Sequence, residues 1–265
     1  MKAWRNNWKQ HAKRMLDYAR VADLPSSHVL WAGPSRLTGA PIMAVAMCSR
    51  ERSENGKTGD MIQVAIMNQT VSPARAYFLG EDGDVCPGDC AHRSKPRGGK
   101  GTCYVNKVKL RSAWDRAVAL VSAGTIGVPA GFWEGARVRI GNEGDGAAVP
   151  LEVWRTIADE CAGWTAYTAG WRGLSSEWAR IFMASVQTPA EALEASAQGW
   201  RFFASSSSPD DDRAYDAISR ACLNTSHGVA CVACRGCDGI DKGARRASFW
   251  IPQHGAVGSA LRDKA

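Results

Sequence analysis

The sequence has no long apolar run and no secretory leader. None of its apolar stretches approaches the roughly 20 residues that a membrane-spanning helix needs. The basic segment 1–25 lacks the unbroken apolar stretch and the small-residue cleavage site of a secretory signal. These two absences predict a protein of the cytoplasm that has no membrane partner.

Motifs of two common classes of phosphate chemistry are also missing. Tyr104 and Lys107 have the Tyr-x-x-Lys spacing of rolling-circle replication nucleases, but none of the five histidines forms the His-hydrophobe-His metal pair of those enzymes. The Gly-rich segments 33–39 and 96–101 do not fit the G-x4-G-K-[S/T] phosphate loop. The sequence therefore argues against both classes.

Cysteine is plentiful, with nine residues in 265. In a reducing compartment, closely spaced cysteines more often bind metals or take part in catalysis than form disulfides. The odd number also leaves one cysteine over in any complete pairing scheme. Seven of the nine fall into two groups, which we call the first group (Cys86, Cys90 and Cys103) and the second group (Cys222, Cys231, Cys234 and Cys237).

The second group contains a C-x2-C-x2-C motif, preceded by Cys222 with eight residues between them. Two-residue spacing lets successive thiolates converge on one metal centre. Four thiolates bind zinc tetrahedrally, and three closely spaced cysteines with a remote fourth are also typical of ferredoxin-type [4Fe–4S] clusters. The pattern predicts a bound metal and leaves both metals open.

The first group resembles the cluster motif of radical S-adenosylmethionine enzymes, which is C-x3-C-x2-C after the first barrel strand with an aromatic residue beside the last cysteine. Here Cys86 and Cys90 form C-x3-C, Cys103 follows after twelve intervening residues, and Tyr104 comes next. The resemblance implies a cluster with one open iron for S-adenosylmethionine. The longer second interval leaves an alternative, in which Asp89 or His92 completes a closed zinc site.

Strand-like and helix-like segments alternate after the first group. This alternation is typical of βαβ units and predicts an α/β fold with parallel strands, as a barrel or partial barrel ahead of a doubly wound open sheet. An amphipathic helix at 1–27 would precede a single domain at 28–265. The expected strands are 41–47, 61–67, 136–141, 164–168, 182–186, 200–205 and 247–252, and the expected helices are 109–124, 150–163, 175–181, 188–199 and 210–221.

Functional sites of such folds lie at the carboxyl ends of the strands. Four residues at or just after the ends of expected strands are therefore candidates to line a catalytic pocket: Glu143, Asp145, Tyr167 and Gln187. The alternative is that the two carboxylates belong to a solvated turn and that the tyrosine belongs to the core.

The chain carries a net charge of +7 and has a pI near 9.0, which favours an anionic partner such as nucleic acid. The basic residues around the first group are candidates for phosphate contacts: Lys95, Arg97, Lys100, Lys107 and Lys109.

Several further motifs are spread over roughly residues 28–255. They are "NGKTGDMIQ", "GEDGDVCPGDC", "GTCYVN", "VRIGNEGD", "TAYTAGW", "MASVQTPAEA" and the second cysteine group. Together they resemble an uncharacterised cysteine-rich protein family of tailed bacteriophages and prophages. This resemblance implies a viral origin and action in the bacterial host cell, but it implies no mechanism.

Two hypotheses about function remain. One is an iron–sulfur enzyme that modifies a nucleic-acid or host-derived substrate, and the other is a zinc-stabilised binding module.

Overall fold

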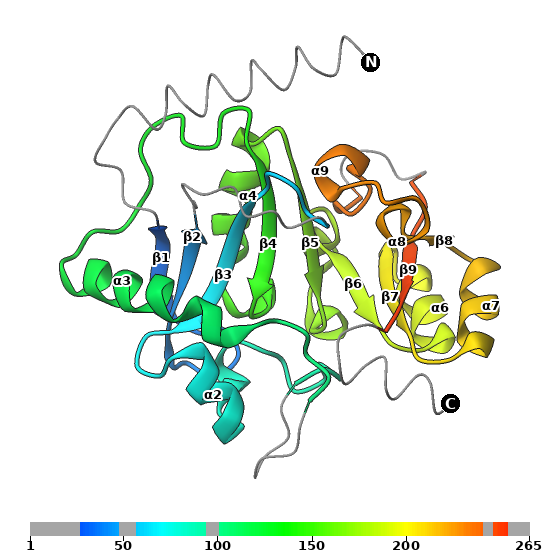
Figure 1. Ribbon diagram of the computed structural model, residues 1–265, viewed down its shortest axis with the longest axis horizontal. Coiled ribbons are helices and arrows are strands. Elements are labelled where there is room, and N and C mark those ends of the chain that lie inside the picture. Colours follow the sequence, from blue (N-terminus) through cyan, green and yellow to red (C-terminus); the bar gives the residue numbers. More distant parts are fainter. Residues whose placement is uncertain (1–26, 48–56, 94–100, 241–245, 254–265) are drawn as a thin grey trace.

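The structure is a computed structural model that describes residues 27–47, 57–93, 101–240 and 246–253 (Figure 1). The helix expected at 1–27 lies almost entirely outside the described residues.

One sheet of nine strands runs through the described chain, in the order β1-β2-β3-β4-β5-β6-β7-β9-β8. β1, β2 and β3 pair antiparallel, and every later pairing is parallel. The strands are β1 (Ser27–Pro34), β2 (Pro41–Met47), β3 (Ile62–Asn68), β4 (Arg137–Glu143), β5 (Gly163–Thr168), β6 (Met183–Val186), β7 (Phe202–Ser206), β8 (Arg220–Ala221) and β9 (Phe249–Pro252).

The α/β class with a parallel sheet is confirmed, but a closed barrel is not what the described strands form. The antiparallel strands β1 and β2 extend the sheet on one side, and the short strand β8 ends it on the other. No pairing between described strands joins these two edges.

Helices connect most of the parallel strands, as the alternating pattern predicts. They are α2 (Pro73–Leu79), α3 (Arg111–Ser122), α4 (Leu151–Glu160), α5 (Ser176–Ala179), α6 (Pro189–Ala197), α7 (Pro209–Asp216), α8 (Leu223–His227) and α9 (Cys231–Cys234), with short 3-10 turns η1 (Asp82–Asp84), η2 (Lys107–Leu110), η3 (Gly146–Ala148) and η4 (Trp171–Gly173). None of the described helices is long and apolar enough to cross a membrane.

Local sequence explains where two of these helices begin. The Thr188 hydroxyl accepts a hydrogen bond from the Glu191 amide at the start of α6, and Ser208 does the same for Asp211 in α7. Each helix has proline in its first turn, where the missing amide hydrogen costs nothing. Both starts follow from the sequence within a residue or so.

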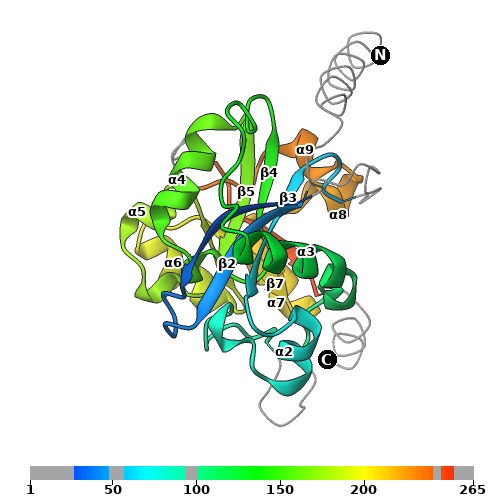
Figure 2. The same cartoon turned by 90° about the vertical axis from the view of Figure 1, so that its left-hand side faces the viewer.

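The two faces of the sheet are covered differently. Helices α4 to α7 pack on one face and form the main apolar core with residues such as Ile140, Ala166 and Phe202. On the other face, α3 covers β1 to β3, and α8 and α9 lie near the opposite end (Figure 2). Between them, β4 and β5 carry partly exposed Arg139 and Tyr167. We call this second, partly polar surface the open face.

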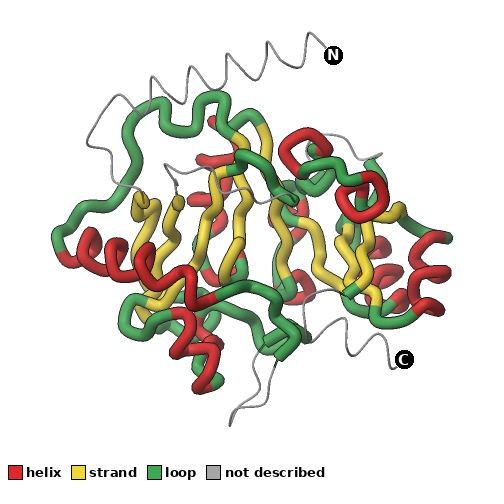
Figure 3. The backbone as a smooth tube through the Cα atoms, viewed as in Figure 1, coloured by secondary structure: helices red, strands yellow, loops and turns green. Residues whose placement is uncertain are grey.

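The carboxyl ends of the parallel strands lie side by side along one end of the sheet. We call this end of the sheet the carboxyl edge, as distinct from the outer strands β1 and β8. Loops from the region of α2, η1 and η2 run along this edge, at the bottom of the view in Figure 3. The first cysteine group lies in these loops, whereas α8 and α9 with the second group lie towards the opposite edge (Figure 1).

Candidate functional site

A buried ion pair lies at the carboxyl edge. The ammonium of Lys107 in η2 donates to both carboxylate oxygens of Glu143 at the end of β4, at 2.7 and 2.6 Å. Lys107 and Glu143 are only 7% and 3% exposed. The Lys107 nitrogen also lies 5.1 Å from the centre of the Tyr77 ring, within cation–π range.

The electrostatics of this pair favour a charged lysine. Burial alone would lower the pKa of Lys107, but the Glu143 carboxylate outweighs it and raises that pKa above its usual value. Burial raises the pKa of Glu143, and the attraction of Lys107 opposes that rise. The two short hydrogen bonds support an ion pair near neutral pH.

The ion pair joins two residues for which the sequence predicts different roles: Glu143 in a catalytic pocket and Lys107 in phosphate contacts. Glu143 does lie in a buried site at a strand end, where the sequence places a pocket residue. Lys107, however, does not offer its ammonium to a phosphate at the surface, because it is buried against Glu143. Lys109 is exposed, and Lys95, Arg97 and Lys100 lie outside the described residues.

Asp145 holds three loops together. Its two carboxylate oxygens accept hydrogen bonds from the amides of Ala147 and Ala169 at 2.9 and 2.7 Å. Its own amide donates to the carbonyl of Val85, one residue before the first cysteine. Burial raises the pKa of the Asp145 carboxyl, and these amide donors oppose that rise. Asp145 therefore positions the loop that carries Cys86.

The cysteines of the first group lie in neighbouring loops, because the amide of Cys103 donates to the carbonyl of His92 at 2.9 Å. Burial raises the pKa of the Cys90 thiol to about 11, and the charge of Cys103 adds to this rise. Burial also raises the pKa of Cys86, with further contributions from Glu143 and Cys90. Cys86 and Cys90 therefore favour the protonated thiol at neutral pH, and the first group lies beside the buried ion pair.

Asp89 and His92, the alternative fourth ligands, lie in the same region. The His92 ring nitrogen Nδ1 is 2.7 Å from the Thr102 hydroxyl. Burial lowers the pKa of His92, so its imidazole favours the neutral form that binds metals. The charge of Asp89 contributes to the raised pKa of Asp145.

The second group is also brought together. Burial raises the pKa of the Cys237 thiol, and the charges of Cys222, Cys231 and Cys234 raise it further. The amide of Cys231 donates to the carbonyl of Lys57 at 2.7 Å, which attaches the loop just before β3 begins. The second group therefore lies at the opposite end of β3 from the first.

Tyr167 belongs to the second group's surroundings. It is hydrogen-bonded to the Cys237 sulfur, which lowers the pKa of that thiol against the effect of burial. Its ring packs against Phe203 with centroids 4.6 Å apart. The structure therefore places Tyr167 beside a cysteine that the sequence did not connect with it.

Arg139 lies between the two groups on the open face. It donates to the hydroxyl of Tyr104 at 3.0 Å, and Tyr104 directly follows Cys103. Its charge also lowers the pKa of Cys231 against the effect of burial. Arg139 is a site residue that the sequence analysis missed. The available signal was a charged side chain in the middle of the expected strand 136–141.

Two unsatisfied polar atoms mark the same part of the open face. Gln63 and Arg139 are direct neighbours across β3 and β4. Within the described structure, Gln63 Oε1 and Arg139 Nε are buried and have no hydrogen-bond partner. Buried polar groups normally have partners, so this pair is suited to receive a polar ligand.

Gln187 lies apart from this surface. It follows β6, and its amide donates to Glu191 at the start of α6. Its side-chain oxygen is buried without a partner among the described residues. The structure thus brings Glu143 and Asp145 together with the first group and Tyr167 with the second group, but it connects Gln187 with neither.

The donor chemistry of both groups fits a thiophilic metal. In the described parts of the chain, however, no set of three or more His, Cys, Asp or Glu side chains is arranged to hold a metal ion. Because thiolates rather than thiols bind metals, loading either group would release protons. Four neighbouring thiols suit zinc or an iron–sulfur cluster, and three suit a cluster with one open iron.

Comparison of the chain with protein-family models, curated proteins and solved structures finds no match. The resemblance of its motifs to a phage family and to radical S-adenosylmethionine enzymes therefore stays a prediction.

Replacing Lys107 by methionine should destabilise the protein strongly. The change leaves the Glu143 carboxylate buried without its partner, which typically costs about 3–5 kcal/mol. Chemical denaturation would measure the loss in the free energy of unfolding. The double variant Lys107→Met/Glu143→Leu should recover most of it, because no buried charge remains.

The exposed pair of Arg111 and Asp115, 2.8 Å apart, provides the matched control. Arg111→Met should change stability little, because solvent screens such pairs. Equal effects of Lys107→Met and Arg111→Met would contradict the buried ion pair.

Proposed function

We propose that the protein is a metal-dependent enzyme of the radical S-adenosylmethionine kind. In this proposal the first group holds an iron–sulfur cluster with one open iron, and the second group holds an auxiliary cluster or a structural metal. The observation that carries the proposal is the position of the first group in neighbouring loops at the carboxyl edge, where the Cys103 amide donates to the His92 carbonyl, beside the buried pair of Lys107 and Glu143.

The order of the strands supports the proposal. β3 is the first strand of the parallel run β3, β4, β5, β6, β7 and β9, and the first group follows it in the chain. Radical S-adenosylmethionine enzymes carry their cluster motif after the first barrel strand. We interpret this run as a partial barrel, in which α4 to α7 cover the outside and the open face is the inside.

The residues around the first group suit an anionic metal centre. Lys107 brings one positive charge close to Cys86 and Cys103, whose charges raise its pKa in return. Asp145 fixes the loop before Cys86 through the Val85 carbonyl. Arg139 and Tyr104 then connect this end of the open face with the second group.

A cluster held by Cys86, Cys90 and Cys103 would supply the one-electron reduction that cleaves S-adenosylmethionine to methionine and a 5′-deoxyadenosyl radical. The chain's own residues would hold and orient the substrate on the open face, where Gln63 and Arg139 have unsatisfied polar atoms. The substrate would be a nucleic acid or a host-derived molecule, and the reaction would take place in the cytoplasm of a bacterial host.

Anaerobic reconstitution of the full chain with iron and sulfide tests this proposal. We expect absorption in the iron–sulfur charge-transfer region and, after reduction by dithionite, release of 5′-deoxyadenosine from S-adenosylmethionine. Metal analysis would accompany both measurements. A colourless protein with stoichiometric zinc at the first group would contradict the enzyme and favour a zinc-stabilised binding module.

A further inference from the structure

A small pocket opens at the edge of the sheet opposite to the first group. It has a volume of about 150 Å³ and lies between the amino ends of β4 and β5 and the loop of the second group. Arg137 from β4 and two residues of the C-terminal loops, Arg235 and Arg246, line it. Met61 and Trp164 provide apolar walls.

The positive charge in this pocket is only partly balanced. Asp238 also lines it, but one of its carboxylate oxygens binds the buried Arg201 at 3.0 Å and the other binds Arg246 at 2.7 Å. Within the described ranges, Arg137 and Arg235 form no ion pair with a carboxylate. Two guanidinium groups are therefore left to a ligand.

The two guanidinium groups also repel each other. Burial lowers the pKa of Arg137, and the charge of Arg235 lowers it further. Like charges held together in this way are relieved by an anion that binds between them.

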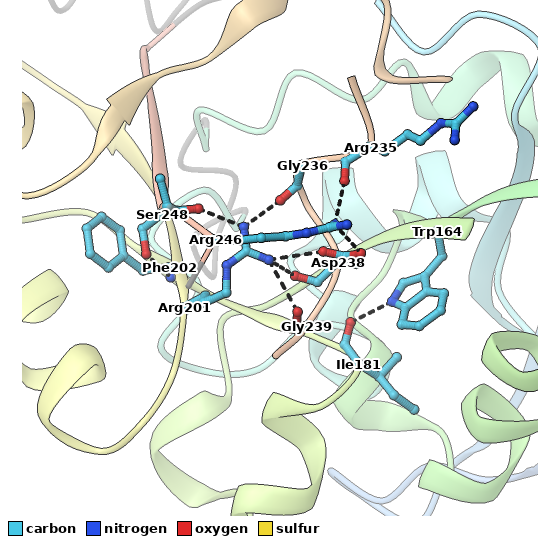
Figure 4. A network of polar contacts seen from close by, with 11 residues as sticks. Trp164, Ile181, Arg201, Phe202, Arg235, Gly236, Asp238, Gly239, Arg246 and Ser248 are labelled. Atoms are coloured by element: carbon cyan, nitrogen blue, oxygen red, sulfur yellow. Dashed lines mark hydrogen bonds and ion pairs between the residues drawn. The ribbon is translucent and has the colours of Figure 1, made fainter. Parts of the chain in front are cut away.

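Arg235 is the C-cap residue of α9 and has a φ of 57°, the left-handed conformation in which many helices end. Glycine adopts this conformation without strain and is the usual residue there. Figure 4 shows the side chains of Arg235 and Arg246 extending in the same direction from their loops, with the indole of Trp164 below them.

The Trp164 wall is held firmly. Its indole nitrogen donates to the carbonyl of Ile181 at 2.8 Å, and the side chain is buried. Arg246 is oriented by a second hydrogen bond, to the carbonyl of Arg235 at 2.9 Å. The pocket is therefore largely formed before any ligand binds.

We propose that this pocket binds the terminal phosphate group of a small molecule. Arginine matches phosphate oxygens with pairs of parallel hydrogen bonds, and a phosphomonoester carries about −1.5 to −2 charges near pH 7, close to the two unpaired guanidinium groups. Pockets that enclose a whole drug-sized ligand measure about 300–1,000 Å³. This pocket therefore takes the phosphate while the rest of the ligand extends outward.

Calorimetric titration with inorganic phosphate tests the proposal on the anaerobically purified full chain, with metal content measured in parallel. We expect saturable binding that weakens about tenfold or more in Arg137→Gln, the loss typical of one charge-assisted hydrogen bond. Arg75→Gln removes an exposed charge from α2 and should bind phosphate like the unmodified protein.

Arg235→Gly separates binding from folding. Glycine adopts the left-handed conformation freely, so this variant should keep or raise the unfolding temperature while phosphate binding weakens about tenfold or more. Retained binding in both Arg137→Gln and Arg235→Gly would overturn the proposal.

Two other results would also overturn it. If phosphate does not bind and Arg137→Gln lowers the metal content, the arginines serve to balance the charge of the second group. If a single-stranded oligonucleotide without terminal phosphates binds more tightly than phosphate and Arg137→Gln abolishes this binding, the pocket belongs to a nucleic-acid surface.

Discussion

Replacing Cys234 by alanine is expected to remove the metal of the second group and most of the protein's stability. Free energies of metal binding at structural thiolate sites are about 10–16 kcal/mol near pH 7, and they count towards folding. Folded proteins of ordinary size are stable by only about 5–15 kcal/mol. Loss of one of four ligands should therefore exceed what the rest of the fold can offset.

The local structure is the reason we expect this region to depend on a metal. Of the cysteines in the second group, only Cys237 is buried, and it joins a small cluster with Met183 and Phe249. Helices α8 and α9 contain no buried residue. With so little apolar burial, the loop has few other interactions that fix its conformation.

Metal analysis and thermal unfolding of anaerobically purified protein would measure this effect. Cys161→Ala is the matched control, because Cys161 is a buried cysteine at the end of α4 and belongs to neither group. It should retain the metal and lose little stability. If Cys234→Ala keeps its full metal content, or if neither protein contains metal, the metal site of the second group is refuted.

Replacing Cys103 by alanine is expected to abolish cleavage of S-adenosylmethionine. A cluster in the first group has only three thiolate ligands, so losing one removes the centre that binds and activates the cosubstrate. The metal of the second group should stay in place, because the loop that carries it attaches at the opposite end of β3. Measuring 5′-deoxyadenosine and metal content in the same samples separates these effects.

His92→Ala and Asp89→Ala form the companion variants for this experiment. In the proposed enzyme neither residue is a ligand of the first group, so both variants should keep the charge-transfer absorption after reconstitution. In a closed zinc site, one of them should lose zinc as Cys103→Ala does. Cleavage that persists in Cys103→Ala would show that the first group does not hold the active centre.

The two cysteine groups also have a physical connection that their sequence positions do not suggest. The hydroxyl of Tyr104, which lies beside the first group, accepts a hydrogen bond from Arg139. The charge of Arg139 also lowers the pKa of Cys231 in the second group. Tyr167 binds Cys237 from the neighbouring strand. Residues of the open face therefore connect the two cysteine groups, which lie towards opposite ends of the strands.

Much of the architecture could be predicted from the sequence because its causes are local. Thr188 and Ser208 cap α6 and α7, and proline in each first turn marks the same boundaries. Alternation of strands and helices predicted the parallel sheet. The strand Ser27–Pro34 and the short helices α8 and α9 were missed, because no expected element was assigned to those segments.

The sequence by itself also determined the two cysteine groups, since their spacing is a property of the chain. Only the tertiary structure decided that the sheet stays open between β1 and β8. It also decided that Lys107 pairs with Glu143, and that Arg137 and Arg235 line the same pocket. These partners are far apart in the chain, and their meeting depends on which strands become neighbours and where each loop returns. A local pattern contains the chemistry of each side chain, but the path of the folded backbone determines which side chains meet.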